Sequence, residues 1–139
     1  MRSIRNGSWL VLCALVACGG EPETGLRRSD AAPVLAALSG AGPGVAELRG
    51  GRIREARTRF EAALAKDPEQ LGALNALAVS YSLEERFEAA RQLLDEVVAR
   101  GSSRDQQRAL VNLGELHALE GYLAAARAHF ESARTIDPA

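Results

Sequence analysis

Apolar and polar residues alternate with a helical period over the second half of the chain. Several groups of apolar residues stand three or four positions apart, so the members of each group share one face of a helix. The groups are Leu74, Leu77, Ala78 and Tyr81; Phe87, Ala90, Leu94 and Val97; and Leu123, Ala126, Phe130 and Ala133. The pattern predicts five helices, near residues 53–66, 70–83, 86–100, 106–119 and 122–136.

Turn-forming residues separate these predicted helices. Asp67, Pro68 and Gln70 predict a helix start, with Asp67 as N-cap, Pro68 at the first helical position and Gln70 three residues after the cap. Gly101 and Gly121 are predicted C-caps. Residues 101–106 (GSSRDQ) are expected to form a longer turn before the next helix.

An apolar stretch at residues 31–39 (AAPVLAALS) precedes the first strong helical pattern. It is long enough for one or two helical turns, and residues 41–44 (AGPG) interrupt it. A short helix packed on the following elements and a free tail are both open interpretations of this stretch.

The helical region is also internally repetitive. The segment GRIREA at residues 51–56 resembles GYLAAA at residues 121–126, and a phenylalanine follows each after four residues, as Phe60 and Phe130. A weaker middle copy contains Ala90, which follows Ala56 by 34 residues and precedes Ala126 by 36. Repetition at this period indicates a stacked array of similar helical units.

The composition limits the fold classes and the kinds of partner that can be expected. The chain of 139 residues is long enough for one domain. Hydrophobic residues make up 47% but aromatic residues only 4%, so the core must consist of alanine, leucine and valine, which favours packed helices. The net charge of −1 provides no large field to recruit nucleic acid, so no nucleic-acid partner is expected.

The N-terminal residues have the organisation of an export signal. Arg2 and Arg5 precede the apolar run WLVLCALVA at residues 9–17, which is too short to span a bilayer. Residues 15–18 (LVAC) resemble the lipobox of bacterial lipoproteins. This resemblance implies a signal peptide at 1–17 and lipid attachment at Cys18. The segment 18–32, with glycine, proline and mixed charge but no apolar period, is expected to be the lipidated N-terminus and a flexible tether. An ordinary cleaved signal or a short anchor with an incidental cysteine is the alternative interpretation.

The repeats resemble the tetratricopeptide repeat, whose pattern is W-x2-L-G-x2-Y, then A-x3-F, A and P. The middle copy supplies Leu74, Leu77, Ala78, Tyr81, Ala90, Leu94 and Val97, and the last supplies Leu110, Leu113, Gly114, His117, Ala126, Phe130, Ala133 and Pro138. The first copy matches only from Ala56 onward, so its first helix is expected to be shortened, irregular or absent.

The resemblance implies an all-α fold: a right-handed superhelical stack of helical hairpins with about 2.5–3 repeats. The expected domain covers residues 33–139, with a degenerate repeat at 37–70 and further repeats at 71–104 and 107–139. Leu64 and Val98 follow the second alanine site of the pattern (Ala63 and Val97) in the first two copies, whereas Arg134 follows Ala133 in the third. That change is expected at the end of an array.

The sequence contains no recognisable set of catalytic or metal-ligating residues, so no enzymatic activity, metal or cofactor is expected. His117 stands at the tyrosine position of the repeat and is expected to be a packing residue. His129, twelve positions later, is expected on a different helix with an exposed face.

The first helices of such repeats line a peptide-binding groove, and the resemblance therefore implies groove candidates. They are Asn75, Val79 and Ser82 in the middle copy, and Arg108, Val111, Asn112 and Glu115 in the last. Asparagine can bind a peptide backbone as donor and acceptor, and Arg108 can pair with a carboxylate.

Together these resemblances imply a lipid-anchored adaptor of the bacterial envelope, exported and held at the outer membrane facing the periplasm. Lipoproteins of this kind resemble pilotins and the repeat lipoproteins of tight-adherence pilus assembly. The expected partner is a protein or peptide of an envelope complex, with homodimerisation through an end face as a further option. A regulatory subunit of an envelope enzyme and a structural remnant are the alternative interpretations.

Overall fold

The computed structural model describes residues 44–136, and this part of the chain folds into helices without a strand. Several predicted features lie outside these residues: the export signal, the lipid attachment at Cys18, the stretch at 31–39 and Pro138. The helices are α2 (Val45–Arg49), α3 (Ile53–Lys66), α4 (Leu71–Leu83), α5 (Phe87–Arg100), α6 (Ser103–Leu119) and α7 (Leu123–Thr135). The all-α prediction is confirmed.

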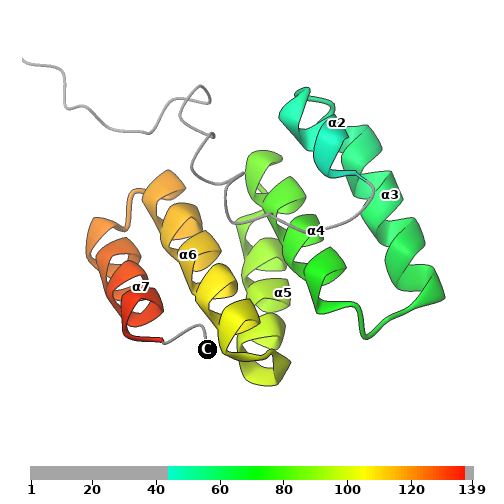
Figure 1. Cartoon of the computed structure of the whole chain (residues 1–139). Helices are drawn as coiled ribbons and strands as arrows, with labels where there is room; N and C mark the ends of the chain where they lie inside the picture. The colour runs from blue at the N-terminus through cyan, green and yellow to red at the C-terminus, as the bar shows by residue number, and fades with distance from the viewer. Residues whose placement is uncertain (1–43, 137–139) are drawn as a thin grey trace, which may run out of the picture.

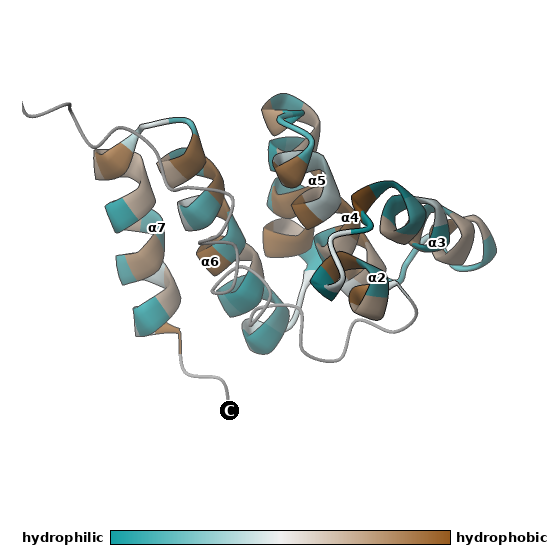
Figure 2. Cartoon of the chain, turned by 90° about the horizontal axis from the view of Figure 1, so that it is seen from above, coloured by the Kyte–Doolittle hydropathy of each residue, from teal (hydrophilic) through white to brown (hydrophobic). Residues whose placement is uncertain are grey.

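The helices form a row of hairpins that follows the order of the chain (Figure 1). Each helix packs against the next, and α4 also contacts α6. From above, α6 and α7 lie side by side at one end of the row, while α2 lies near α3 and α4 at the other (Figure 2). The short α2 stands where the first helix of the degenerate copy was expected.

Two hydrophobic clusters hold helices α2 to α6 together. Leu48 of α2, Phe60 of α3 and Leu77 of α4 belong to the first cluster. The second joins α4, α5 and α6 and includes Leu94, Leu113 and Leu116. Alanines at the repeated positions, such as Ala56 and Ala90, are fully buried where neighbouring helices approach closely. The alternation of polar and apolar residues along α7 in Figure 2 corresponds to its amphipathic sequence.

The turns inside the three hairpins share one backbone geometry. Gly51, Glu85 and Gly121 each have a positive φ after a helix end. At Gly121 the amide of Tyr122 donates to the carbonyl of His117 at 2.8 Å, which closes a Schellman motif. Glu85 adopts this conformation without the freedom of glycine, so a shared repeat geometry overrides the local preference there.

Two predicted helix starts differ from the structure. Asp67 is not the N-cap of α4, because that helix begins at Leu71 and Asp67 ends α3. The Asp67 carboxylate instead accepts a hydrogen bond from the amide of Glu69 at 3.1 Å. Residues 101–106 are also not a long turn, since α6 begins at Ser103, directly after the N-cap Ser102.

Ser102 and Asp105 form a capping box that starts α6. The Ser102 hydroxyl accepts from the amide of Asp105 at 3.4 Å, and the Asp105 carboxylate accepts from the amide of Ser102 at 3.2 Å. These contacts satisfy backbone donors that have no partner inside the helix. The additional residues between the last two repeats therefore extend α6.

Ser102→Ala is expected to lower the unfolding free energy by about 1 kcal/mol, because the first turn of α6 loses its side-chain acceptor. Urea denaturation followed by circular dichroism measures this change. Ser103→Ala is the matched control, since Ser103 is exposed and already helical. Equal effects of the two substitutions would contradict the capping role.

Candidate protein-binding site

The groove candidates on α4 are buried in the structure. Asn75, Val79 and Ser82 lie on one helix face, yet each has little solvent contact. Val79 belongs to the cluster that joins α2, α3 and α4. The Ser82 hydroxyl donates to the carbonyl of Ala78 at 3.0 Å. In this conformation these three residues help to pack α4 rather than form an open surface.

Asn75 and Asn112 meet between the first helices of consecutive repeats. Asn112 Nδ2 donates to Asn75 Oδ1 at 2.9 Å, and the two residues are only 3% and 5% exposed, respectively. Asn112 Oδ1 is buried without a hydrogen-bond partner. A buried carbonyl oxygen without a donor is costly, so this atom retains an unused capacity to accept a hydrogen bond.

Three further candidates on α6 remain partly exposed. Arg108, Val111 and Glu115 lie within one face of the helix, and Asn112 stands at the edge of that face. Burial raises the pKa of the Glu115 carboxyl above its usual range because desolvation disfavours the charged form. This face offers a cation, an apolar side chain and a carboxylate beside the amide pair.

A cluster of polar side chains that the sequence analysis did not foresee joins α5, α6 and α7. The rings of His117 and His129 stack with their centroids 5.1 Å apart and their planes at 6°. His117 Nδ1 lies 3.4 Å from Glu120 Oε2, and Arg91 Nη2 donates to both carboxylate oxygens of Glu120 at 2.8 and 3.1 Å. The two histidines do lie on different helices, but the hairpin turn brings them together.

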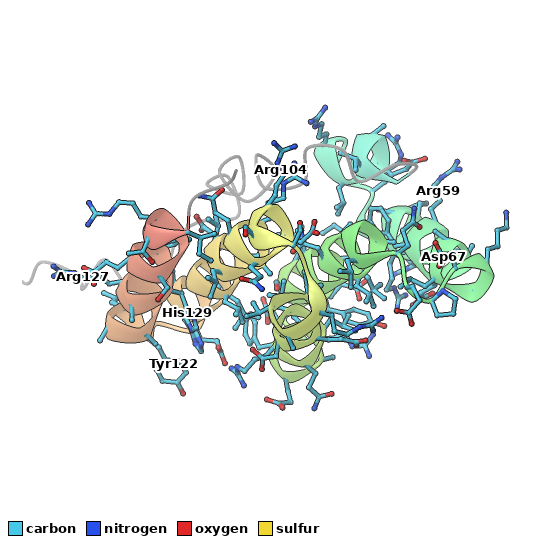
Figure 3. All side chains as sticks on the ribbon, turned by 60° about the horizontal axis from the view of Figure 1, so that its bottom comes forward. Arg59, Asp67, Arg104, Tyr122, Arg127 and His129 are labelled. Atoms are coloured by element: carbon cyan, nitrogen blue, oxygen red, sulfur yellow. The ribbon has the colours of Figure 1, made fainter. Side chains whose placement is uncertain are left out.

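Electrostatics in this cluster favour a neutral His129. Burial lowers its pKa by desolvating the charged ring, nearby His117 lowers it further, and Asp95 acts in the opposite direction. The Glu120 carboxylate beside Arg91 raises the pKa of that guanidinium. Tyr122 packs edge-on against His117, with a centroid distance of 6.2 Å. Tyr122 and His129 emerge on the same side of the α6–α7 hairpin (Figure 3).

Stability is expected to fall as the pH drops through about 6.5, the ordinary histidine pKa. The unfolded chain binds a proton at His129 in this range, whereas the native chain resists it, so acid favours unfolding. Urea midpoints measured between about pH 7.5 and pH 5.5 test this dependence. His129→Gln should flatten the pH profile even if it changes stability at pH 7.5, and an unchanged slope would contradict this account.

The described residues contain no group of three or more His, Cys, Asp or Glu side chains arranged to hold a metal ion. Over the same part of the chain, no helix combines the length and the hydropathy needed to cross a membrane. The partly exposed side chains of α6 (Arg108, Val111 and Glu115) provide ionic and apolar groups that suit contacts with a protein surface.

A row of helical hairpins in which each packs only on its neighbours defines the class of helical-repeat proteins. Within that class, the chain belongs to the tetratricopeptide repeat family, whose sequence profile matches residues 44–104 and 84–139. The repeats indicate an adaptor role in protein–protein interaction, and the family is typically non-catalytic. No curated protein and no solved structure gave a significant match.

Proposed function

We propose that this chain is a lipid-anchored adaptor of the bacterial envelope that binds a protein partner on the first helices of its repeats, α4 and α6. The contact between α4 and α6 carries the binding part of the proposal. It places the Asn75–Asn112 pair beside the partly exposed Arg108, Val111 and Glu115. A peptide backbone could donate to Asn112 Oδ1 after a modest opening of this contact, while Arg108 and Glu115 pair with charged side chains.

The anchoring part rests on the sequence. LVAC at residues 15–18 follows a positively charged start and an apolar run, and it resembles a lipobox. Lipid on Cys18 and the tether that follows would hold the repeats close to the outer membrane, facing the periplasm. Confinement there raises the local concentration of the adaptor around an envelope complex, such as a pilus or secretion assembly.

Metabolic labelling with a radioactive fatty acid tests the anchor. The wild-type chain, expressed in a bacterial host with the lipoprotein pathway, should incorporate label and fractionate with membranes. Cys18→Ala should lose both properties, whereas Cys13→Ala should keep them. Label or membrane association that persists in Cys18→Ala would overturn the lipid anchor.

Crosslinking in the native envelope, followed by purification of the tagged chain, tests the binding face. Arg108→Ala/Glu115→Ala should lose a partner that the wild type captures. Arg104→Ala/Glu96→Ala is the matched control, because it removes the same charges from other positions on α5 and α6. If both double variants capture the partner equally, the face of α6 that carries Arg108 and Glu115 is not the binding site.

A further inference from the structure

The end of the row formed by α6 and α7 carries a partly apolar groove. Its volume is about 560 Å³, and its lining is Ala118, Leu123, Ala126, Arg127, Phe130, Glu131 and Arg134. Leu123 is 71% exposed and Phe130 is 37% exposed. Within residues 44–136, α6 is the helix that packs extensively against α7. An exposed, partly apolar surface with a positioned aromatic side chain is a candidate interaction site.

The neighbouring helix α6 holds the ring of Phe130 in place. A Cβ atom added to Gly114 of α6 would lie 2.5 Å from Phe130 Cε1, so the ring fills the space that glycine leaves. One side of the ring is therefore held against α6 while the rest remains accessible. Phe130 is thus a positioned aromatic side chain, of the type that anchors many interfaces.

The preceding repeat shows which kind of element packs on such a surface. Leu123, Ala126 and Phe130 stand 36 positions after Phe87, Ala90 and Leu94 of α5. Those three residues of α5 belong to the cluster in which Ala109, Leu113 and Leu116 of α6 are buried. The α6–α7 groove therefore repeats the surface against which the chain already packs one amphipathic helix.

The charges of the two surfaces also correspond. Arg127 stands 36 positions after Arg91, which donates to Glu120 near the end of α6. On the end face Arg127 instead pairs with Glu131 of its own helix at 2.9 Å. It projects outward from α7, away from the other helices (Figure 3). An exposed pair of this kind contributes little to stability, so Arg127 is available to a better carboxylate partner.

One position distinguishes the end face from its counterpart. Arg134 stands at the repeat position of Val98, which packs against the cluster that joins α4, α5 and α6. Because α6 begins next to the end of α5, the equivalent of Arg134 lies near the first turn of an incoming helix. Acidic residues in the first turn of that helix would match both Arg134 and the helix dipole.

We propose that the α6–α7 end face binds an amphipathic helix of a partner protein. The partner helix carries small or aliphatic residues at positions i, i+4 and i+7, as α6 does at Ala109, Leu113 and Leu116. It carries a carboxylate at i+11 for Arg127, as Glu120 does for Arg91, and an acidic first turn for Arg134. This inference rests on the proposed adaptor role and names a second surface with its own ligand chemistry.

The charge of the face argues for a different protein rather than a second copy of this chain. A twofold dimer that pairs two such faces brings Arg127 and Arg134 of both copies together, with only Glu131 of each to offset them. Like charges placed together across an interface oppose association. An acidic helix removes this conflict and uses both arginines.

A fluorescent peptide with the sequence of residues 103–120 (SRDQQRALVNLGELHALE) is the probe. It has the apolar positions, the carboxylate of Glu120 and one acidic residue, Asp105, in its first turn. Anisotropy titration with the full-length chain should give saturable binding. Arg127→Glu/Arg134→Glu should weaken binding at least tenfold, about the loss of one charge-assisted contact. Arg54→Glu/Arg104→Glu, the same charge change at exposed sites elsewhere, should bind like the wild type.

A charge exchange makes the test specific to Arg127. A peptide carrying Glu120→Lys should bind the wild type weakly and recover on Arg127→Glu. The absence of saturable binding would overturn the proposal. Binding that does not depend on Arg127 would also overturn it, because it would show that the peptide displaces the chain's own α6. A dimer in sedimentation that Arg127→Glu/Arg134→Glu dissociates would also overturn it. Partner capture that depends on Arg108 and Glu115 reports separately on the proposed adaptor function.

Discussion

Leu94→Ala is expected to lower the free energy of unfolding by about 2–5 kcal/mol. Leu94 has 0% exposure and lies in the cluster that joins α4, α5 and α6. The substitution removes buried methyl groups and leaves a cavity that the surrounding helices can close only in part. A domain of this size has a total stability of about 5–15 kcal/mol, so a large fraction is lost. Urea denaturation of the full chain measures the change.

Phe130→Ala is the matched comparison, because Phe130 occupies the same repeat position as Leu94, 36 residues later. Its ring is 37% exposed and contacts a neighbouring helix on one side only, so the expected loss is smaller despite the larger side chain. Equal losses at the two positions would contradict the account of α7 as the last helix of the row within residues 44–136. The comparison therefore separates the effect of position in the array from the effect of the repeat motif.

Helices α3, α5, α6 and α7 could be predicted from the sequence because each combines an apolar face with a polar one at a helical period. The predicted ranges 53–66 and 86–100 agree with α3 and α5 to within one residue. The start of α6 was harder to predict from the sequence, because Ser102 and Asp105 are typical of a turn as well as of a capping box. Whether such a segment begins a helix depends on how the preceding helix packs, which local composition does not contain.

The candidate site was predictable in helical phase but not in exposure. Asn75, Val79 and Ser82 share one face of α4, as their spacing in the sequence implies, yet the contacts of α4 with its neighbours bury that face. The pairing of His117 with His129 was hidden for a related reason. The register of two antiparallel helices depends on the turn between them, and here a Schellman motif at Gly121 sets it.

Asn112→Leu is expected to cost about 1–3 kcal/mol of unfolding free energy, because it leaves buried Asn75 Oδ1 without its donor. Asn75→Leu should cost a similar amount by isolating Asn112 Nδ2. The double variant should cost much less than the sum, since replacing both partners of a buried hydrogen bond with apolar groups can be nearly neutral. Urea denaturation of the four proteins gives the coupling energy, and additive losses would contradict direct pairing.

The same four proteins separate packing from recognition. The buried, unsatisfied Asn112 Oδ1 lowers native stability, so a role beyond packing would explain why an amide stands at this position. If the pair serves a partner, the double variant should keep its stability yet lose partner capture in the native envelope. If the double variant is stable and still captures the partner, the pair only sets the register of α4 against α6. In that case the contact surface consists of the partly exposed side chains of α6.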